Sequence, residues 1–274
     1  MPRGGRVDAV EPMRPLFDAS SPPTGLPPHL AELYGGGLEL PPDLLYANFV
    51  TSLDGVAALP APARSGALLS GRNPADRFLM GLLRALADAV VVGAGTLRAE
   101  PGHLWTPAYV SRDLASAFSE LGRPDPRTVV VSASGRVDPA APALERGALV
   151  LTTDGGAARL AGRLPHASSL RSLGPQQPRG SAILEAVRAE GHRRVLTEGG
   201  PKLMAAFMED RLLDELFLTL SPLFAGRRSG DGRLALFEGV ELLPGDTEWA
   251  RLLSVRAHGS HLFLRYSFSR SGDE

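Results

Sequence analysis

Residues 193–210 read RRVLTEGGPKLMAAFMED, in which a short apolar strand runs through a glycine pair into an apolar helix. We predict the strand at residues 194–197 and the helix at residues 201–210, where Pro201 suits the first turn because its φ is already helical. A strand followed at once by a helix is typical of parallel sheets. Backbone N–H groups at such a junction face the carboxyl edge of the sheet, where α/β proteins bind ligands.

The same alternation of strand and helix extends in both directions from this segment. Residues 90–92 and 129–131 are unbroken valine runs, which indicate strands covered on both faces by helices. We predict further strands at residues 45–51, 89–92, 128–131, 148–152 and 215–220, and helices at residues 74–87, 155–163 and 181–190. Residues 252–257 and 261–268, joined by Gly259-Ser260, predict an antiparallel hairpin. The fold class is therefore α/β, with three αβα layers, a mostly parallel sheet and a C-terminal antiparallel hairpin.

The first part of the chain has a different composition. Residues 1–43 are rich in proline and glycine, with Pro22-Pro23, Pro27-Pro28, Gly35-Gly36-Gly37 and Pro41-Pro42, which interrupt helices and strands. We predict a lead-in at residues 1–43, in which only residues 29–34 pack on the body, and one domain at residues 44–274.

Composition excludes several classes of function. The chain has 274 residues, with 29 basic and 30 acidic side chains, so its formal net charge is −1. This balance argues against nucleic-acid or polybasic membrane partners. Without cysteine there are no disulfides, zinc thiolates or cysteine nucleophiles, and the histidines lack metal-ligand spacing, so we expect no metal. The N-terminus has no apolar signal core, and a cytoplasmic location is expected.

Two glycine turns are candidate anion sites. Residues 92–96 read VGAGT and residues 197–203 read TEGGPKL, and each follows an apolar strand. Their backbone N–H groups, with the Thr96 hydroxyl and the Lys202 charge, suit a phosphate. The alternative is an ordinary strand exit in which the glycines take positive φ.

A third motif reads NFVTSLDG at residues 48–55. Asn48 and Ser52 could line a ligand cleft. Asp54 is either a catalytic acid or, as the Asp-Gly pair favours, a turn former.

In this order, TSLDG, VGAGT and TEGGP resemble the C-terminal reductase domain of the bifunctional riboflavin-biosynthesis deaminase/reductase, which has a dihydrofolate reductase-like fold. Matching stretches cover nearly everything after residue 44, whereas the zinc-binding deaminase half is absent, so a stand-alone reductase is implied. The resemblance implies hydride transfer from NADPH to a pyrimidine, as in 5-amino-6-(5-phosphoribosylamino)uracil reductase. It also implies a homodimer that pairs through C-terminal sheet edges.

The resemblance and the motifs above together predict roles for individual residues. The candidate proton donors are Glu198 first, Asp54 second and bound water third, and Arg136 is available for a 2′-phosphate. Substrate contacts fall to Asn48, Ser52, Arg84 and Glu198. Coenzyme contacts fall to Val50, Gly93, Gly95, Thr96, Glu100, Ser132, Ser134, Gly199, Gly200, Pro201, Lys202 and Leu203.

The sequence departs from the family in one segment. The family reads Thr-x-x-Ala-Asp-Asp-Pro and then places an arginine that grips the substrate phosphate. Here residues 96–107 read TLRAEPGHLWTP, so Glu100 stands in for an acid and the arginine is missing. The departure leaves two alternatives open, a pterin or dihydrofolate-like substrate and a catalytically silent NADPH-binding regulatory module.

Overall fold

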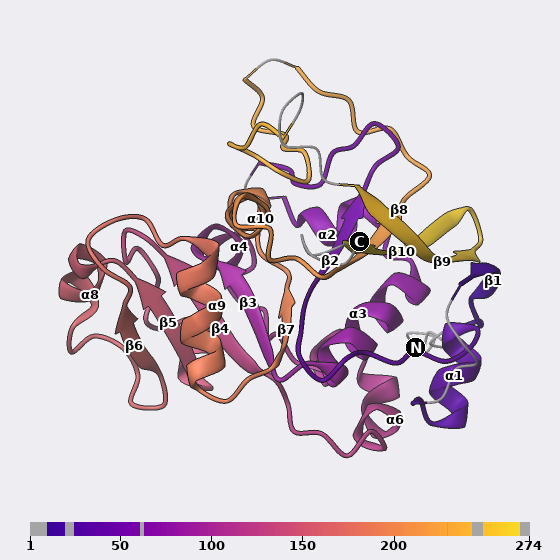
Figure 1. The fold of residues 1–274 in the computed structure, drawn as a ribbon, viewed down its shortest axis with the longest axis horizontal. Helices are drawn as coiled ribbons and strands as arrows, with labels where there is room; N and C mark the ends of the chain where they lie inside the picture. Colours follow the sequence, from indigo (N-terminus) through magenta and orange to yellow (C-terminus); the bar gives the residue numbers. More distant parts are fainter. Residues whose placement is uncertain (1–9, 20–24, 61–62, 229, 243–248, 269–274) are drawn as a thin grey trace, which may run out of the picture.

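The computed structural model describes residues 10–19, 25–60, 63–228, 230–242 and 249–268, so the Pro22-Pro23 pair lies outside the described residues. Its centre is a ten-stranded sheet with the order β1-β9-β10-β8-β2-β7-β3-β4-β5-β6 (Figure 1). The strands are β1 (Arg14–Asp18), β2 (Leu44–Thr51), β3 (Ala89–Gly93), β4 (Arg127–Ser132), β5 (Ala148–Thr152), β6 (Ser169–Ser172), β7 (Arg194–Thr197), β8 (Glu215–Leu220), β9 (Ala250–His258) and β10 (His261–Phe268). The helices are α1 (Pro28–Tyr34), α2 (Ser65–Leu69), α3 (Pro74–Leu86), α4 (Ala94–Ala99), α5 (Pro107–Val110), η1 (Arg112–Leu114), α6 (Ala115–Ser119), α7 (Pro142–Glu145), α8 (Asp154–Leu160), α9 (Gly180–Ala189) and α10 (Pro201–Glu209).

The strand directions confirm the predicted fold class. All the pairs from β8 through β2, β7, β3, β4 and β5 to β6 are parallel. Strands β10 and β9 form the predicted antiparallel hairpin. The hairpin does not end the sheet as expected, because β1 pairs antiparallel with β9 on its outer side.

Two apolar cores lie on opposite faces of the sheet. Val90 and Val92 belong to the core under α1, α3 and α6, and Val91 belongs to the core under α9 and α10. All three valines are fully buried. Neighbouring side chains of a strand point to opposite faces of the sheet. Because helices cover both faces here, every residue of the strand is buried, and the run of valines is unbroken.

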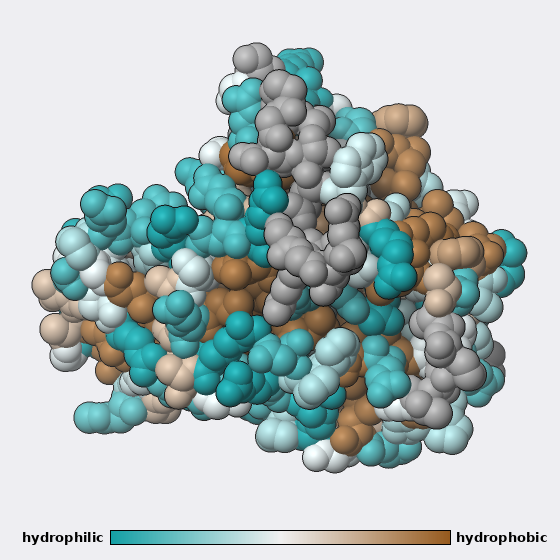
Figure 2. Space-filling view, viewed as in Figure 1, coloured by the Kyte–Doolittle hydropathy of each residue, from teal (hydrophilic) through white to brown (hydrophobic). Residues whose placement is uncertain are grey.

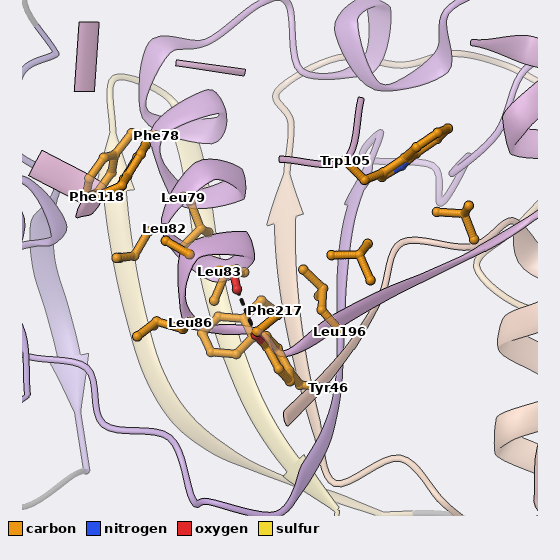
Figure 3. Close-up of a cluster of buried hydrophobic side chains, with 14 of the residues drawn as sticks. Tyr46, Phe78, Leu79, Leu82, Leu83, Leu86, Trp105, Phe118, Leu196 and Phe217 are labelled. Carbon is orange, nitrogen blue, oxygen red and sulfur yellow. Dashed lines mark hydrogen bonds between the residues drawn. The ribbon is translucent and has the colours of Figure 1, made fainter. Parts of the chain in front are cut away.

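Helix α3 is the main element of the first core. Asn73 caps its N-terminus, and the Asn73 side chain accepts a hydrogen bond from Ala75 N at 2.8 Å. Its leucine stripe packs on Tyr46 and Phe217, and the Tyr46 hydroxyl donates to Leu83 O at 2.7 Å (Figure 3). This packing fixes the rotation of α3 about its axis. It therefore also determines which residues of α3 face the carboxyl ends of the strands.

The N-terminal segment corrects the prediction of an unstructured lead-in. It contains β1 and α1, and Met13 N donates to Leu33 O at 2.9 Å. The proline and glycine residues delimit these elements instead of breaking them, because Pro28 begins α1 and Gly35 ends it in the left-handed region at φ 73°. The expected packing of residues 29–34 is confirmed, since Leu30, Leu33 and Tyr34 are buried.

No helix in the described part of the chain is long and apolar enough to cross a membrane.

Candidate functional site

One cavity of about 690 Å³ lies at the carboxyl ends of β2, β7, β3 and β4. This is within the size range of small-molecule sites, roughly 300–1,000 Å³. Its walls come from the ends of those strands, from α3 and from the starts of α4 and α10. It gathers most of the predicted site residues, namely Asn48, Val50, Arg84, Gly93, Gly95, Thr96, Glu100, Ser132, Ser134, Glu198, Gly199, Gly200, Pro201, Lys202 and Leu203.

The two glycine turns meet in this cavity. Strands β3 and β7 are neighbours, and Glu198 N donates to Val91 O at 3.1 Å. Gly93 and Gly200 are the N-cap residues of α4 and α10, and no side chain caps either helix. A Cβ atom on Gly200 would lie 3.6 Å from Thr96 Oγ1, so it would fill the space between the turns.

The glycines of these turns are not required for backbone conformation. Gly93 has φ −80° and Gly200 has φ −68°, so the alternative of positive-φ turn glycines is wrong for both. A Cβ atom on Gly95 would meet nothing within 4 Å. Glycine at these positions keeps the cavity wall bare, and a ligand can approach the backbone closely.

The end of β4 forms a second part of the wall, with arginines around it. Ser132 and Ser134 line the cavity, as does Arg98, whose Nη1 donates to Arg136 O at 3.0 Å. Arg159 Nε donates to Ser134 O at 3.1 Å. Arg136 itself is not among the lining residues.

Arg84 and Glu198 form a buried ion pair on the opposite wall. Arg84 Nε donates to Glu198 Oε1 at 2.9 Å, and Arg84 Nη2 donates to Glu198 Oε2 at 2.6 Å. The remaining N–H groups of Arg84 donate to Leu104 O, Thr106 O and His103 Nε2. Since a guanidinium has five N–H donors, all are used by protein groups. Arg84 therefore positions Glu198, and its predicted contact with the substrate stays a prediction.

His103 binds to the Arg84 side of this ion pair, and no metal-ligand or catalytic spacing in the sequence singled it out. Burial, followed by the charges of Arg84 and Arg64, lowers the pKa of His103 to about 3. The ring is therefore neutral near pH 7 and accepts from Arg84 at Nε2, so its proton lies on Nδ1. Nδ1 lies 3.8 Å from Glu100 Oε2. Glu100 thus belongs to the Arg84 wall.

Asp76 is a lining residue that sequence reasoning missed. It lies in the first turn of α3 and is only 6% exposed. Burial raises the pKa of Asp76 to about 6, and the nearby Thr219 and Ser70 hydroxyls oppose the shift. The available signal was its spacing, because residues 76, 80 and 84 share one face of the helix.

Ser52 and Asp54 do not lie on this cavity. Ser52 Oγ donates to Asp54 Oδ1 at 2.6 Å, and Asp54 accepts from Ala225 N at 3.0 Å and from Gly226 N at 2.7 Å. These hydrogen bonds lower the pKa of Asp54 to about 2, so it holds no proton at neutral pH. The structure gives Asp54 the turn-forming role, with Gly55 at φ 79°, instead of a catalytic one. It likewise places Ser52 away from the predicted substrate contacts.

Comparison with known proteins assigns the family. The model of the RibD C-terminal domain matches residues 44–256, most of the chain. The chain belongs to the RibD C-terminal domain family. Strand β1 and helix α1 precede the matched residues.

Individual relatives agree with this assignment. A 2,5-diamino-6-ribosylamino-4(3H)-pyrimidinone 5′-phosphate reductase of Archaeoglobus fulgidus is 28% identical over 187 residues, which cover 67% of this chain and 82% of that protein. A pyrimidine reductase-like protein of Corynebacterium diphtheriae has a similar fold, with a TM-score of 0.63, 24% identity and coverage of 88% and 99% of the two chains. RibD of Acinetobacter baumannii gives a TM-score of 0.62 at 18% identity, over 88% of this chain and 60% of that one.

Proposed function

We propose that this member of the RibD C-terminal domain family is an NADPH-dependent reductase of a ribosylaminopyrimidine in riboflavin biosynthesis. One observation carries the proposal, the convergence of the Gly93–Thr96 and Gly199–Leu203 backbone segments on a single cavity. The name of the Archaeoglobus fulgidus relative supports the reaction, because that protein reduces a pyrimidinone that carries a ribosylamino 5′-phosphate.

The cavity fits a dinucleotide in its chemistry. The uncapped start of the nine-residue helix α10 offers partial positive charge to a phosphate, and Lys202 adds a full charge beside it. Gly95 and Gly200 both line the cavity, and a Cβ atom on Gly200 would lie 3.6 Å from Thr96 Oγ1. Gly93, Gly95, Thr96, Gly200 and Lys202 are thus the residues that would hold the coenzyme phosphates.

The preference for NADPH over NADH is assigned to the arginines beside Ser134. Arg98 and Arg159 donate to the backbone oxygens of Arg136 and Ser134, and Arg136 is the third arginine of this segment. Among the residues that the structure describes, no ion pair joins any of the three to a carboxylate. Unpaired guanidinium groups beside a cavity suit a phosphate, which they bind through paired N–H donors.

When bound, the nicotinamide coenzyme supplies the hydride. The protein contributes position and exclusion of water. Arg84 holds both oxygens of Glu198 toward the cavity, and Val50 forms part of the wall at the end of β2. Glu198, which Arg84 holds at the cavity wall, stays our candidate for handling the proton.

Substitution of Gly200 by Asp tests the coenzyme site. The new carboxylate would enter the space between the glycine turns and repel a phosphate, so we expect NADPH affinity to fall by at least about 100-fold. Titration calorimetry measures the affinity directly. Ala189→Asp is the matched control, because Ala189 is an exposed residue at the end of α9 and does not line the cavity. Unchanged NADPH affinity in Gly200→Asp, with the control intact, would contradict the assignment.

The reductase activity needs its own test. Oxidation of NADPH is followed with the diaminopyrimidinone ribosylamino 5′-phosphate and with the uracil analogue as substrates, each with and without the phosphate. NADPH binding without turnover of any of these would favour the regulatory-module alternative. The proposal also includes a homodimer and a cytoplasmic location, and sedimentation velocity tests the former.

A further inference from the structure

The side of Arg84 that faces away from Glu198 is bound by a neighbouring loop. Arg84 is only 1% exposed, so each of its N–H groups needs an acceptor in the protein. Beyond the pair with Glu198, Nη1 lies 3.3 Å from Leu104 O and 3.4 Å from Thr106 O. Nη2 lies 3.0 Å from His103 Nε2. The contact with His103 is therefore the shortest hydrogen bond of Arg84 outside the ion pair.

This hydrogen bond fixes the protonation of the His103 ring. A guanidinium has only donors, so Nε2 has to accept and the ring proton lies on Nδ1. The ring is then neutral, in agreement with its pKa, which burial lowers to about 3. A side chain without an acceptor at this place would leave an N–H of Arg84 buried and unmatched, which is unfavourable.

The ring of His103 is itself held by contacts that do not involve Arg84. Its centroid lies 4.9 Å from the ring centroid of Trp105 and 4.6 Å from that of Tyr109. Trp105 is 2% exposed, and the backbone N–H of His103 donates to Glu100 O at 2.9 Å. The ring is thus fixed to the body of the protein, and it can determine where the Arg84 guanidinium lies.

We propose that His103 is a positioning residue of the reductase, which acts through Arg84 to hold the carboxyl group of Glu198 in the cavity. One nitrogen makes both contacts, because Arg84 Nη2 binds His103 Nε2 on one side and Glu198 Oε2, at 2.6 Å, on the other. Displacement of this nitrogen therefore also displaces Glu198. The inference rests on the proposed function, in which Glu198 handles the proton.

The role follows from a part of the sequence that is particular to this chain. His103 lies in residues 96–107, where the sequence departs from the family pattern, so that pattern does not predict it. His103 also lines the cavity, and direct contact with the substrate is the competing explanation. The experiments below separate the two.

Two amide substitutions of His103, which differ by one methylene group, test the hydrogen bond. In His103→Gln the amide oxygen can take the place of Nε2 and accept from Arg84, whereas in His103→Asn it lies nearer the backbone, at the place of Nδ1. We expect kcat for NADPH-dependent reduction to fall by on the order of 100-fold in His103→Asn, because Glu198 is misplaced. His103→Gln should recover most of this loss. Equal losses in the two variants would overturn the inference.

The KM for NADPH should stay unchanged in both variants, because the coenzyme turns lie at the starts of α4 and α10. Unchanged NADPH affinity by calorimetry also shows that the variants are folded. A rise in the KM for NADPH that matches the fall in kcat would mean that His103 acts on the whole cavity, and it would contradict a specific action on Glu198.

A double-mutant cycle separates action through Glu198 from direct contact with the substrate. His103→Asn is combined with Glu198→Gln, and kcat is measured for the two single variants and the double variant. If His103 acts by positioning Glu198, the double variant is as slow as Glu198→Gln alone. Losses that multiply would show that His103 acts independently of Glu198, and they would overturn the inference.

A measurement without turnover distinguishes this inference from the proposed function. NMR of protein with isotope-labelled arginine follows the exchange of the Arg84 Nε–H with water, and the signal is assigned by its loss in Arg84→Lys. Exchange should be slow in wild type and in His103→Gln, and about tenfold faster or more in His103→Asn, because a buried hydrogen bond is lost. Equal exchange in all three proteins would overturn the inference.

The two failures differ in what they leave standing. If the wild-type protein reduces no pyrimidine, the reductase assignment fails, and the exchange rates alone decide whether His103 holds Arg84. If a pyrimidine is reduced and the glutamine and asparagine variants do not differ, the reductase stands and the role of His103 fails.

Discussion

At the scale of single residues, the carboxyl groups of Asp76 and Asp54 act on stability in opposite directions. Burial raises the pKa of Asp76 to about 6, whereas its ordinary value is 3.8. Between about pH 4 and pH 6 the folded protein thus holds a proton that the unfolded chain has released. The free energy of unfolding should fall as pH rises through this window, by up to about 3 kcal/mol in total.

Asp76→Asn should therefore stabilise the ligand-free protein at pH 7 by up to about 3 kcal/mol and change it little at pH 4. Urea unfolding at the two pH values measures this. Asp54→Asn is the control of opposite sign, because hydrogen bonds lower the pKa of Asp54 to about 2. Its stabilising contribution is present above pH 4 and is lost as pH falls toward 2. A loss of stability at pH 7 in the Asp76 variant would contradict this prediction, because it would show that neighbouring groups stabilise the ionised carboxylate of Asp76.

At the scale of elements, the start of α3 links the cavity to the C-terminal hairpin. Asn73 Oδ1 caps the helix, while Asn73 Nδ2 donates to His261 Nδ1 at 2.9 Å. His261 Nε2 in turn donates to Ser70 O at 3.0 Å. One side chain therefore fixes both the first turn of α3, where Asp76 lies, and the position of β10.

Asn73→Ala should lower the free energy of unfolding by about 1–2 kcal/mol, because the helix loses its cap. Chemical denaturation measures this. Asn73→Ser keeps a capping oxygen but lacks the donor to His261, so it separates the two contributions. If Ser and Ala are equally destabilising, the cap contributes nothing and the His261 contact carries the whole effect.

The elements around the site were largely predictable, and the reasons are local. The strand-glycine-helix pattern at residues 194–209 depends on neighbours in sequence, and the structure follows it closely. The spacing of Asp76 with residues 80 and 84 was visible, but it did not distinguish Asp76 from the solvent-exposed acids that are usual in a first helical turn. Only its burial beside Thr219, a residue of β8, makes it unusual. His103 likewise gains its role from Arg84, which lies on another element.

At the scale of the whole molecule, the N-terminal segment is joined to the end of the sheet. Strand β1 pairs with β9, and Asp18 Oδ2 accepts from Arg256 Nη2 at 2.7 Å. Arg256 is 2% exposed and stacks on the ring of Tyr34 in α1. The proline and glycine content of this segment concealed these contacts, since they depend on β9, more than 200 residues later.

Removing residues 1–19 should destabilise the protein by at least about 2 kcal/mol, because a buried arginine loses its partner. It should also promote aggregation, because β9 becomes an unpaired edge. Urea unfolding and light scattering measure the two effects. Asp18→Asn is the control that removes the charge and keeps the strand, so it should lower stability without aggregation. Full stability in the shortened chain would mean that β1 is dispensable.

Strand β1, the outer strand at this edge of the sheet, is itself partly apolar. Leu16 and Phe17 are each 46% exposed, and Figure 2 shows apolar surface over the β9–β10 end of the molecule. If the proposed homodimer forms at this edge of the sheet, the partner subunit must contact β1, because β1 covers β9.

The hydrogen bonds of the Arg84 guanidinium also make its wall of the cavity rigid. Because every N–H of this side chain already has a partner in the protein, Glu198 has one fixed orientation before any ligand arrives. An incoming molecule would then meet a preorganised wall and would lose little entropy in ordering it. Selectivity on this side of the site would therefore come from rigid shape.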